Sequence, residues 1–235
     1  MKIYVEDVLR IARGEIGYLE KASNYDLDSK TGNPGCNNYT KYARDLWEAN
    51  PHFFQGSKQG APWCTSFYDW CLYKASGNDS TETQRAKYYT GPYGAGCKYA
   101  AMYYKNANAW YNDPKPGDQI FFGHNGEFEH TGLVEKVGDG FVSTIEGNVD
   151  NAVKAKIYNL NDPYIIGYGR PDYYAFSPVQ IPFVDVPSDA WYHDAVVWAY
   201  QQGITAGTDS THFSPDAICT RAMLVTMLYK LYNGE

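Results

Sequence analysis

The chain has 235 residues, of which 44% are hydrophobic, and a net charge of −7 at pH 7. This length allows one domain of ordinary size and a small second one. The negative charge argues against a nucleic-acid surface and against a basic face for anionic membranes. No stretch is apolar for long enough to span a membrane, and the first residues lack the apolar core of a secretory signal.

Two amphipathic helices are expected near the N-terminus. Apolar residues recur at helical spacing in residues 3–16 and again in residues 39–49, and the second stretch ends before Pro51. A polar loop of residues 23–35 separates them. Both helices are expected to pack against the core through their apolar stripes.

A third helix is expected to begin near Cys64. Pro62 suits the first turn of a helix, because an N–H has no partner there, and apolar residues follow at helical spacing from Trp63. Unpaired backbone N–H groups and the positive end of the helix dipole stabilise a thiolate at such a position. Cys64 is therefore the candidate nucleophile. Cys71 lies two turns inside the helix, where the dipole no longer helps, and is expected in the core.

Residues 91–169 are expected to form a helix followed by a sheet. A glycine-rich loop at residues 91–96 precedes a helix expected at residues 97–106. Strands are expected at residues 119–122, 130–137, 141–148 and 164–169. A Gly-Asp-Gly turn joins the second and third of these strands, so they form a hairpin.

The hairpin carries the candidate base. His130 opens its first strand, and alternation along the second strand places Glu146 and Asn148 on one face. A carboxylate and an amide then lie beside the histidine, as the groups that orient a base do. His124 is the alternative base, but no strand follows it directly and it lacks the Glu146 neighbour, so His130 is favoured.

Together these stretches resemble the CHAP domain, the cysteine, histidine-dependent amidohydrolase/peptidase domain of bacterial cell-wall hydrolases. The resemblance rests on residues 63–71, 130–134 and 145–148 in this order, with residues 38–42 upstream, and covers about residues 1–174. It implies an α+β fold of papain-like type, in which helices pack on an antiparallel sheet. It also implies an enzyme that acts on bacterial peptidoglycan.

The implied mechanism is nucleophilic attack by Cys64 on an amide carbonyl, with His130 as the base. Glu146 would orient the imidazole, and Asn148 is the reserve for that role. CHAP domains include N-acetylmuramoyl-L-alanine amidases, which we slightly favour here, and endopeptidases that cut peptide crosslinks. The alternative is a wall-binding protein with a non-catalytic CHAP fold.

Metal and further site residues are weaker expectations. No cofactor is required by this chemistry. Some CHAP domains bind calcium through an Asp-x-Asp loop, and Asp26 with Asp28 is similar to one, although an EF-hand's fifth ligand and final glutamate are missing. Gln59 either supplies an oxyanion-hole amide, as glutamine does in papain-like enzymes, or is a solvated loop residue, which we favour.

The cysteine count limits disulfide formation. The five cysteines stand at positions 36, 64, 71, 97 and 219, so at least one thiol stays unpaired, and no CxxC spacing indicates a zinc site. A bond between Cys36 and Cys97 is compatible with the sequence but is not favoured by it.

A different unit follows a predicted linker at residues 175–181. Residues 182–235 resemble a single S-layer homology (SLH) motif, a small α-helical module. The match rests on residues 183–186, 203–207, 213–215 and 220–222, together with Trp191. In that family the Thr-Arg-Ala turn at a helix start helps bind pyruvylated wall polymers, which points to Thr220 and Arg221.

The single SLH copy departs from its family. Met223 stands where an acidic residue is common, and one repeat is present where three usually assemble. The segment is therefore a wall anchor, a trimerisation element or a packing module. The expected partners are peptidoglycan and a secondary wall polysaccharide, and the expected location is the cell wall or the exterior. The route there is phage lysis, non-classical export or a signal already removed.

Overall fold

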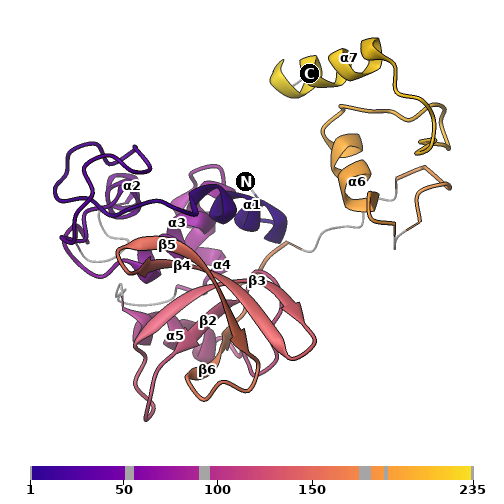
Figure 1. The fold of residues 1–235 in the computed structure, drawn as a ribbon. Helices are drawn as coiled ribbons and strands as arrows, with labels where there is room; N and C mark the ends of the chain where they lie inside the picture. Colours follow the sequence, from indigo (N-terminus) through magenta and orange to yellow (C-terminus); the bar gives the residue numbers. More distant parts are fainter. Residues whose placement is uncertain (1, 51–55, 90–95, 175–180, 188–189, 234–235) are drawn as a thin grey trace. The chain divides into compact units, whose positions relative to one another are not determined.

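The computed structural model describes residues 2–50, 56–89, 96–174, 181–187 and 190–233 (Figure 1). The chain separates into two compact units, Met1–Ala175 and Phe176–Glu235. Residues 175–180 of the predicted linker, and most of the glycine-rich loop at 91–96, lie outside the described residues. In the part of the chain that is described, no helix is both long and apolar enough to cross a membrane.

The described part of the first unit contains five helices, and four of them match predicted stretches. Thr40 caps the second helix by accepting a hydrogen bond from the Ala43 N–H, so this helix begins two residues later than expected. A short helix capped by Asp79, which accepts from the N–H groups of Thr81 and Glu82, was not predicted. The helices are α1 (Val5–Glu15), α2 (Lys41–Ala49), α3 (Cys64–Ala75), α4 (Ser80–Ala86) and α5 (Cys97–Asn106).

The third helix begins at Cys64 itself, with Trp63 as its N-cap. Pro62 therefore lies just before the helix and not in its first turn, which corrects the expectation from the sequence. The correction strengthens the role expected of Cys64, because its own N–H and those that follow are the groups left without helical partners.

A single six-stranded antiparallel sheet completes the first unit, with the strand order β1-β6-β2-β3-β4-β5. Four strands confirm the prediction, whereas β1 and β5 were not expected. The fold is thus α+β, with helices packed on an antiparallel sheet, as the sequence predicted. The strands are β1 (Trp110–Tyr111), β2 (Gln119–Phe122), β3 (His130–Gly138), β4 (Phe141–Val149), β5 (Ala152–Asn159) and β6 (Ile165–Gly169).

Buried side chains lie on both faces of the sheet. Helix α3 packs on β3 and β4, where Leu133 and Ile145 share a core with Phe67 (Figure 1). Side chains on the opposite face form a separate cluster, because successive residues of a strand point to opposite sides. That cluster contains Ile120, Phe122, Val134, Val142 and Tyr168.

Gly147 lets α3 approach the sheet closely. A Cβ at this position would lie 2.5 Å from the Cβ of Phe67 and 2.8 Å from the ring of Trp63. Real Cβ atoms do not approach other atoms so closely, so a side chain here would push the start of α3 outward. The glycine in β4 therefore sets the distance between the hairpin and the first turn of α3.

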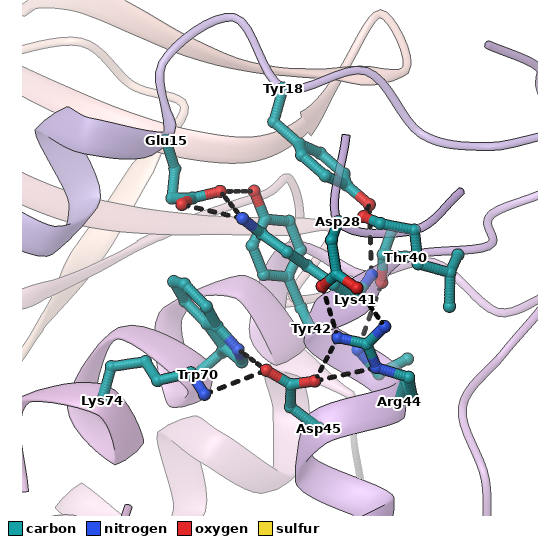
Figure 2. Close-up of polar contacts among 12 residues, drawn as sticks. Glu15, Tyr18, Asp28, Thr40, Lys41, Tyr42, Arg44, Asp45, Trp70 and Lys74 are labelled. Atoms are coloured by element: carbon teal, nitrogen blue, oxygen red, sulfur yellow. Dashed lines mark hydrogen bonds and ion pairs between the residues drawn. The ribbon is translucent and has the colours of Figure 1, made fainter. Parts of the chain in front are cut away.

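A polar network joins α2 to α3 (Figure 2). The carboxylate of Asp45 accepts from the Trp70 indole at 2.8 Å and lies 3.0 Å from the Lys74 ammonium. Arg44 donates to Asp45 and also reaches Asp28 in the preceding loop. These contacts tie α3 to α2 at Trp70 and Lys74.

The described residues of the second unit form two helices, α6 (His193–Gln201) and α7 (Arg221–Asn233). Its small core is formed by Phe183, Val186 and Val196. Asp185 accepts hydrogen bonds from the backbone N–H groups of Phe213 and Ser214 at 2.9 and 2.8 Å. These bonds join the segment before α6 to the loop between α6 and α7. The unit is helical, as predicted.

Candidate active site

Cys64 is the first residue of α3 and only 7% of its surface is exposed. Backbone N–H groups without helical partners surround this position, because the first turn of any helix leaves its donors free. Together with the helix dipole they favour negative charge on the sulfur or on an oxygen bound next to it.

His130 and Glu146 form a close pair on the neighbouring strands. The Nε2 of His130, at the start of β3, lies 2.9 Å from Oε2 of Glu146 on β4. The carboxylate of Glu146 is fully buried, and the imidazole is 19% exposed. The pair is the one expected from the alternation of the hairpin.

The space for this pair comes from Gly132. A Cβ on Gly132 would lie 2.4 Å from Cγ of Glu146. The carboxylate therefore crosses over the glycine to reach His130, two residues earlier on the same strand. Any larger residue at position 132 would block this path.

Two hydroxyl groups fix the buried carboxylate. Thr144, on the same strand, donates a hydrogen bond to Oε1 of Glu146, and Tyr158 donates to Oε2 at 3.3 Å. Such donors offset the cost of burying a carboxylate. Tyr158 was missed by the sequence analysis because β5 was not predicted.

His130 connects the carboxylate to the thiol. Burial by itself would lower the pKa of His130, but hydrogen bonds with Cys64 and Glu146, and their charges, raise it to about 9. The hydrogen bond with Cys97 and burial raise the pKa of the Cys64 thiol, whereas its hydrogen bond with His130 lowers it. Since Nε2 faces Glu146, Nδ1 is the nitrogen left for the sulfur. Cys64, His130 and Glu146 thus form one chain of contacts, with His130 between the thiol and the carboxylate.

The structure places Asn148 outside this chain. A bulge interrupts the β4–β5 register between Glu146 and Val149, and Asn148 has a left-handed backbone with φ 65°. The strand alternation that would put Asn148 beside Glu146 stops at the bulge. Among the described contacts, no hydrogen bond joins Asn148 to His130.

The alternative site residues have other partners. His124 is exposed, and its Nδ1 lies 3.2 Å from a carboxylate oxygen of Glu129 in the same loop. Gln59 accepts from the N–H of Thr40 and donates to the carbonyl of Thr40, both at 2.9 Å, so its amide holds the start of α2. Cys71 is completely buried, as expected, and burial raises the pKa of its thiol.

The loop that contains Asp26 and Asp28 does not fit a calcium ion. Both carboxylate oxygens of Asp28 accept from the Arg44 guanidinium, at 2.9 and 2.6 Å (Figure 2). The arginine neutralises the carboxylate that calcium would require. Nowhere among the described residues do three or more His, Cys, Asp or Glu side chains meet in a group that could hold a metal ion.

A second thiol lies beside Cys64. The Sγ atom of Cys97, the first residue of α5, is 3.7 Å from the Sγ atom of Cys64. All five cysteines are free, so the bond between Cys36 and Cys97 that the sequence allowed is not formed. The sequence predicted the helix start at Cys97, but nothing local indicated that the two helix starts would meet.

Comparison with known families supports both resemblances. Residues 56–148 match the CHAP domain and residues 182–222 match the S-layer homology domain. Both matches confirm what the sequence motifs predicted. The first covers Cys64, His130 and Glu146, and the second ends just after Arg221. No curated protein matches the chain.

Solved structures offer a distant similarity to Ly7917. The structure described as Ly7917 with the hydrolyzing product of MDP is 14% identical, with a TM-score of 0.42 over 72% of this chain. A second structure of Ly7917 is 12% identical, with a TM-score of 0.39 over 71% of this chain. In both cases the alignment spans 62% of the length of Ly7917.

Proposed function

We propose that this chain, which contains a CHAP domain followed by an S-layer homology domain, is a hydrolase that cleaves an amide bond of peptidoglycan. The observation that carries the proposal is the chain of contacts from Cys64 through His130 to the buried Glu146. It joins a thiol at a helix start, a base and a fixed carboxylate, which is the arrangement of a cysteine nucleophile.

In this mechanism His130 takes the proton of Cys64, and the thiolate attacks the amide carbonyl. Backbone N–H groups at the start of α3 stabilise the tetrahedral oxyanion, a contribution often worth about 3 kcal/mol. Glu146 keeps the imidazole in position and stabilises its protonated form. His130 then protonates the departing amine, and water releases the acyl group from Cys64.

Of the bonds that such an enzyme cleaves, we favour the amide between N-acetylmuramic acid and L-alanine over a peptide crosslink. A non-catalytic wall-binding protein is the competing function. It is disfavoured because binding has no need of a carboxylate that is buried, held by two hydroxyl groups and aligned with His130.

Digestion of purified peptidoglycan tests this proposal. The wild-type chain is expected to release soluble fragments, and mass spectrometry is expected to find L-alanine as the new amino terminus. New amino termini within the crosslink would replace the amidase assignment by an endopeptidase. Failure to release fragments from several wall chemistries would contradict the enzyme and leave the binding protein.

We further propose that the second unit anchors the protein to an anionic wall polysaccharide, at the cell wall or outside the cell. Thr220 caps α7 by accepting a hydrogen bond from the Met223 N–H at 3.2 Å. Arg221 is the first residue of α7, and its side chain is exposed. A guanidinium beside a helix N-terminus suits an anionic group such as a pyruvyl acetal.

Replacing Arg221 with alanine is expected to weaken sedimentation with cell walls several-fold, because the positive charge at the start of α7 is lost. The cleavage of soluble wall fragments should stay at the wild-type rate. Arg10→Ala is the matched control, since Arg10 is an exposed arginine on α1 in the first unit. Equal sedimentation of the Arg221 variant and wild type would show that this arginine is not the anchor.

A further inference from the structure

Cys64 has a second close partner that the proposed reaction does not use. The sulfur of Cys97 lies 3.7 Å from the sulfur of Cys64, and the two residues are the first of helices α5 and α3. Both are buried, with 8% and 7% of their surfaces exposed. Hydrolysis needs one nucleophile, so the proposed reaction gives the second thiol no role.

The surroundings of Cys97 favour a reactive thiolate. The Thr65 hydroxyl lies 3.7 Å from the Cys97 sulfur, and the N-terminus of α5 presents its backbone N–H groups there. The hydrogen bond with Cys64 lowers the pKa of the Cys97 thiol, and the fully buried Lys87 lowers it further, although burial opposes both. Cys97 therefore combines a lowered thiol pKa with a second sulfur at 3.7 Å.

The other cysteines lack this arrangement. Cys71 is completely buried on the same helix as Cys64, two turns further along, and among the described contacts it has no cysteine partner. Cys36 and Cys219 are exposed and free. The close approach of two sulfurs is thus specific to the pair that includes the nucleophile.

We propose that Cys64 and Cys97 form a reversible disulfide, which makes the pair an oxidative modification site that blocks the nucleophile. The sulfurs have to approach by about 1.7 Å to reach the S–S bond length of about 2.0 Å. Rotation of the Cys64 and Cys97 side chains about their Cα–Cβ bonds would bring the sulfurs together. The bond goes beyond the proposed hydrolase function, and only its effect on catalysis depends on that function.

The oxidant is a peroxide, and the step balances. One thiolate attacks a peroxide oxygen, the O–O bond breaks, and a sulfenic acid and a water molecule form. The second thiol then attacks the sulfenic sulfur, the S–S bond forms, and a second water leaves. In total the two thiols lose two electrons and two protons, and one hydrogen peroxide is reduced to two waters. A dithiol reductant reverses the step by thiol–disulfide exchange.

The test uses the full chain with Cys36→Ser and Cys219→Ser, so that the exposed thiols do not link two copies. After treatment with hydrogen peroxide, peptide mass spectrometry is expected to find the peptides of Cys64 and Cys97 joined. Peptidoglycan release should fall by about tenfold or more and return with dithiothreitol, because the nucleophile is masked and then restored.

The matched control adds Cys97→Ser to the same background, with Cys97→Ala as a second variant in case the serine is poorly tolerated. Either variant is expected to be active before treatment. Without a partner sulfur, peroxide should drive Cys64 to the sulfinic acid, so the loss should not be reversed by dithiothreitol. Thermal unfolding of each variant verifies that it is folded.

Two results would overturn the proposal: no linkage between Cys64 and Cys97 after oxidation, or equal recovery with and without Cys97. The mass measurement does not require activity. A linked pair in a protein that never releases fragments would therefore contradict the hydrolase and leave the modification site standing. An active protein without linkage would support the hydrolase and contradict the modification site.

Discussion

Replacing Cys64 with alanine is expected to lower the release of peptidoglycan fragments by at least about a thousandfold, because no other group performs the nucleophilic step. The change is small in volume and suits a helix, so the variant should remain folded. The rate of fragment release, measured with a circular dichroism melt of the same sample, verifies both parts.

Cys71→Ala is the matched control for this variant. Cys71 lies on the same helix and is more completely buried, but it belongs to the core and not to the chain of contacts around His130. Its loss is expected to cost about 1 kcal/mol of stability through a small cavity while the rate stays near that of wild type. Activity above background in Cys64→Ala, or an equal loss in Cys71→Ala, would remove the nucleophile assignment.

Replacing His130 with glutamine is expected to slow the reaction by about a thousandfold, since the thiol loses its proton acceptor and the amine loses its proton donor. His124→Gln is the matched control, because His124 also has a glutamate partner, Glu129, but is exposed in a loop. The control should retain nearly full activity in the same peptidoglycan assay. A larger loss at His124 than at His130 would exchange the two assignments.

The Cys64–His130 pair determines the expected pH dependence of the reaction rate. Hydrogen bonds with Cys64 and Glu146, and their charges, raise the pKa of His130 to about 9, and Cys97 and burial raise the pKa of the Cys64 thiol, so the pair keeps its protons towards higher pH. One proton has to leave this pair to give the reactive thiolate. The ratio kcat/KM is therefore expected to rise with pH from about 7 towards 9, as measured in buffers of constant ionic strength.

Glu146→Gln tests the cause of this pH dependence. The amide no longer stabilises the imidazolium, so the rising limb should move to lower pH while the maximal rate falls. A loss of rate without movement of the limb would mean that Glu146 supports the fold and does not tune His130. The circular dichroism melt separates the two outcomes from simple unfolding.

Features set by neighbouring residues were accessible from the sequence alone. The period of apolar residues gave α1, α2, α3 and α5, and the alternation of the hairpin placed Glu146 beside His130. Strand β5 was not predicted, although Val153, Ala155 and Ile157 alternate there with Lys154 and Lys156 as in a strand. Tyr158, which holds Glu146 from that strand, was lost with it.

What the sequence determined by itself is the helix start at Cys64, the strand that begins at His130 and the order of the two matched domains, since caps, periods and turns are encoded within a few residues. Only the tertiary structure decided that Cys97 meets Cys64, that Gly132 and Gly147 make room for the site, and that a bulge removes Asn148 from it. These are contacts between segments far apart in the chain, and they depend on how helices pack on the sheet, which no local pattern specifies.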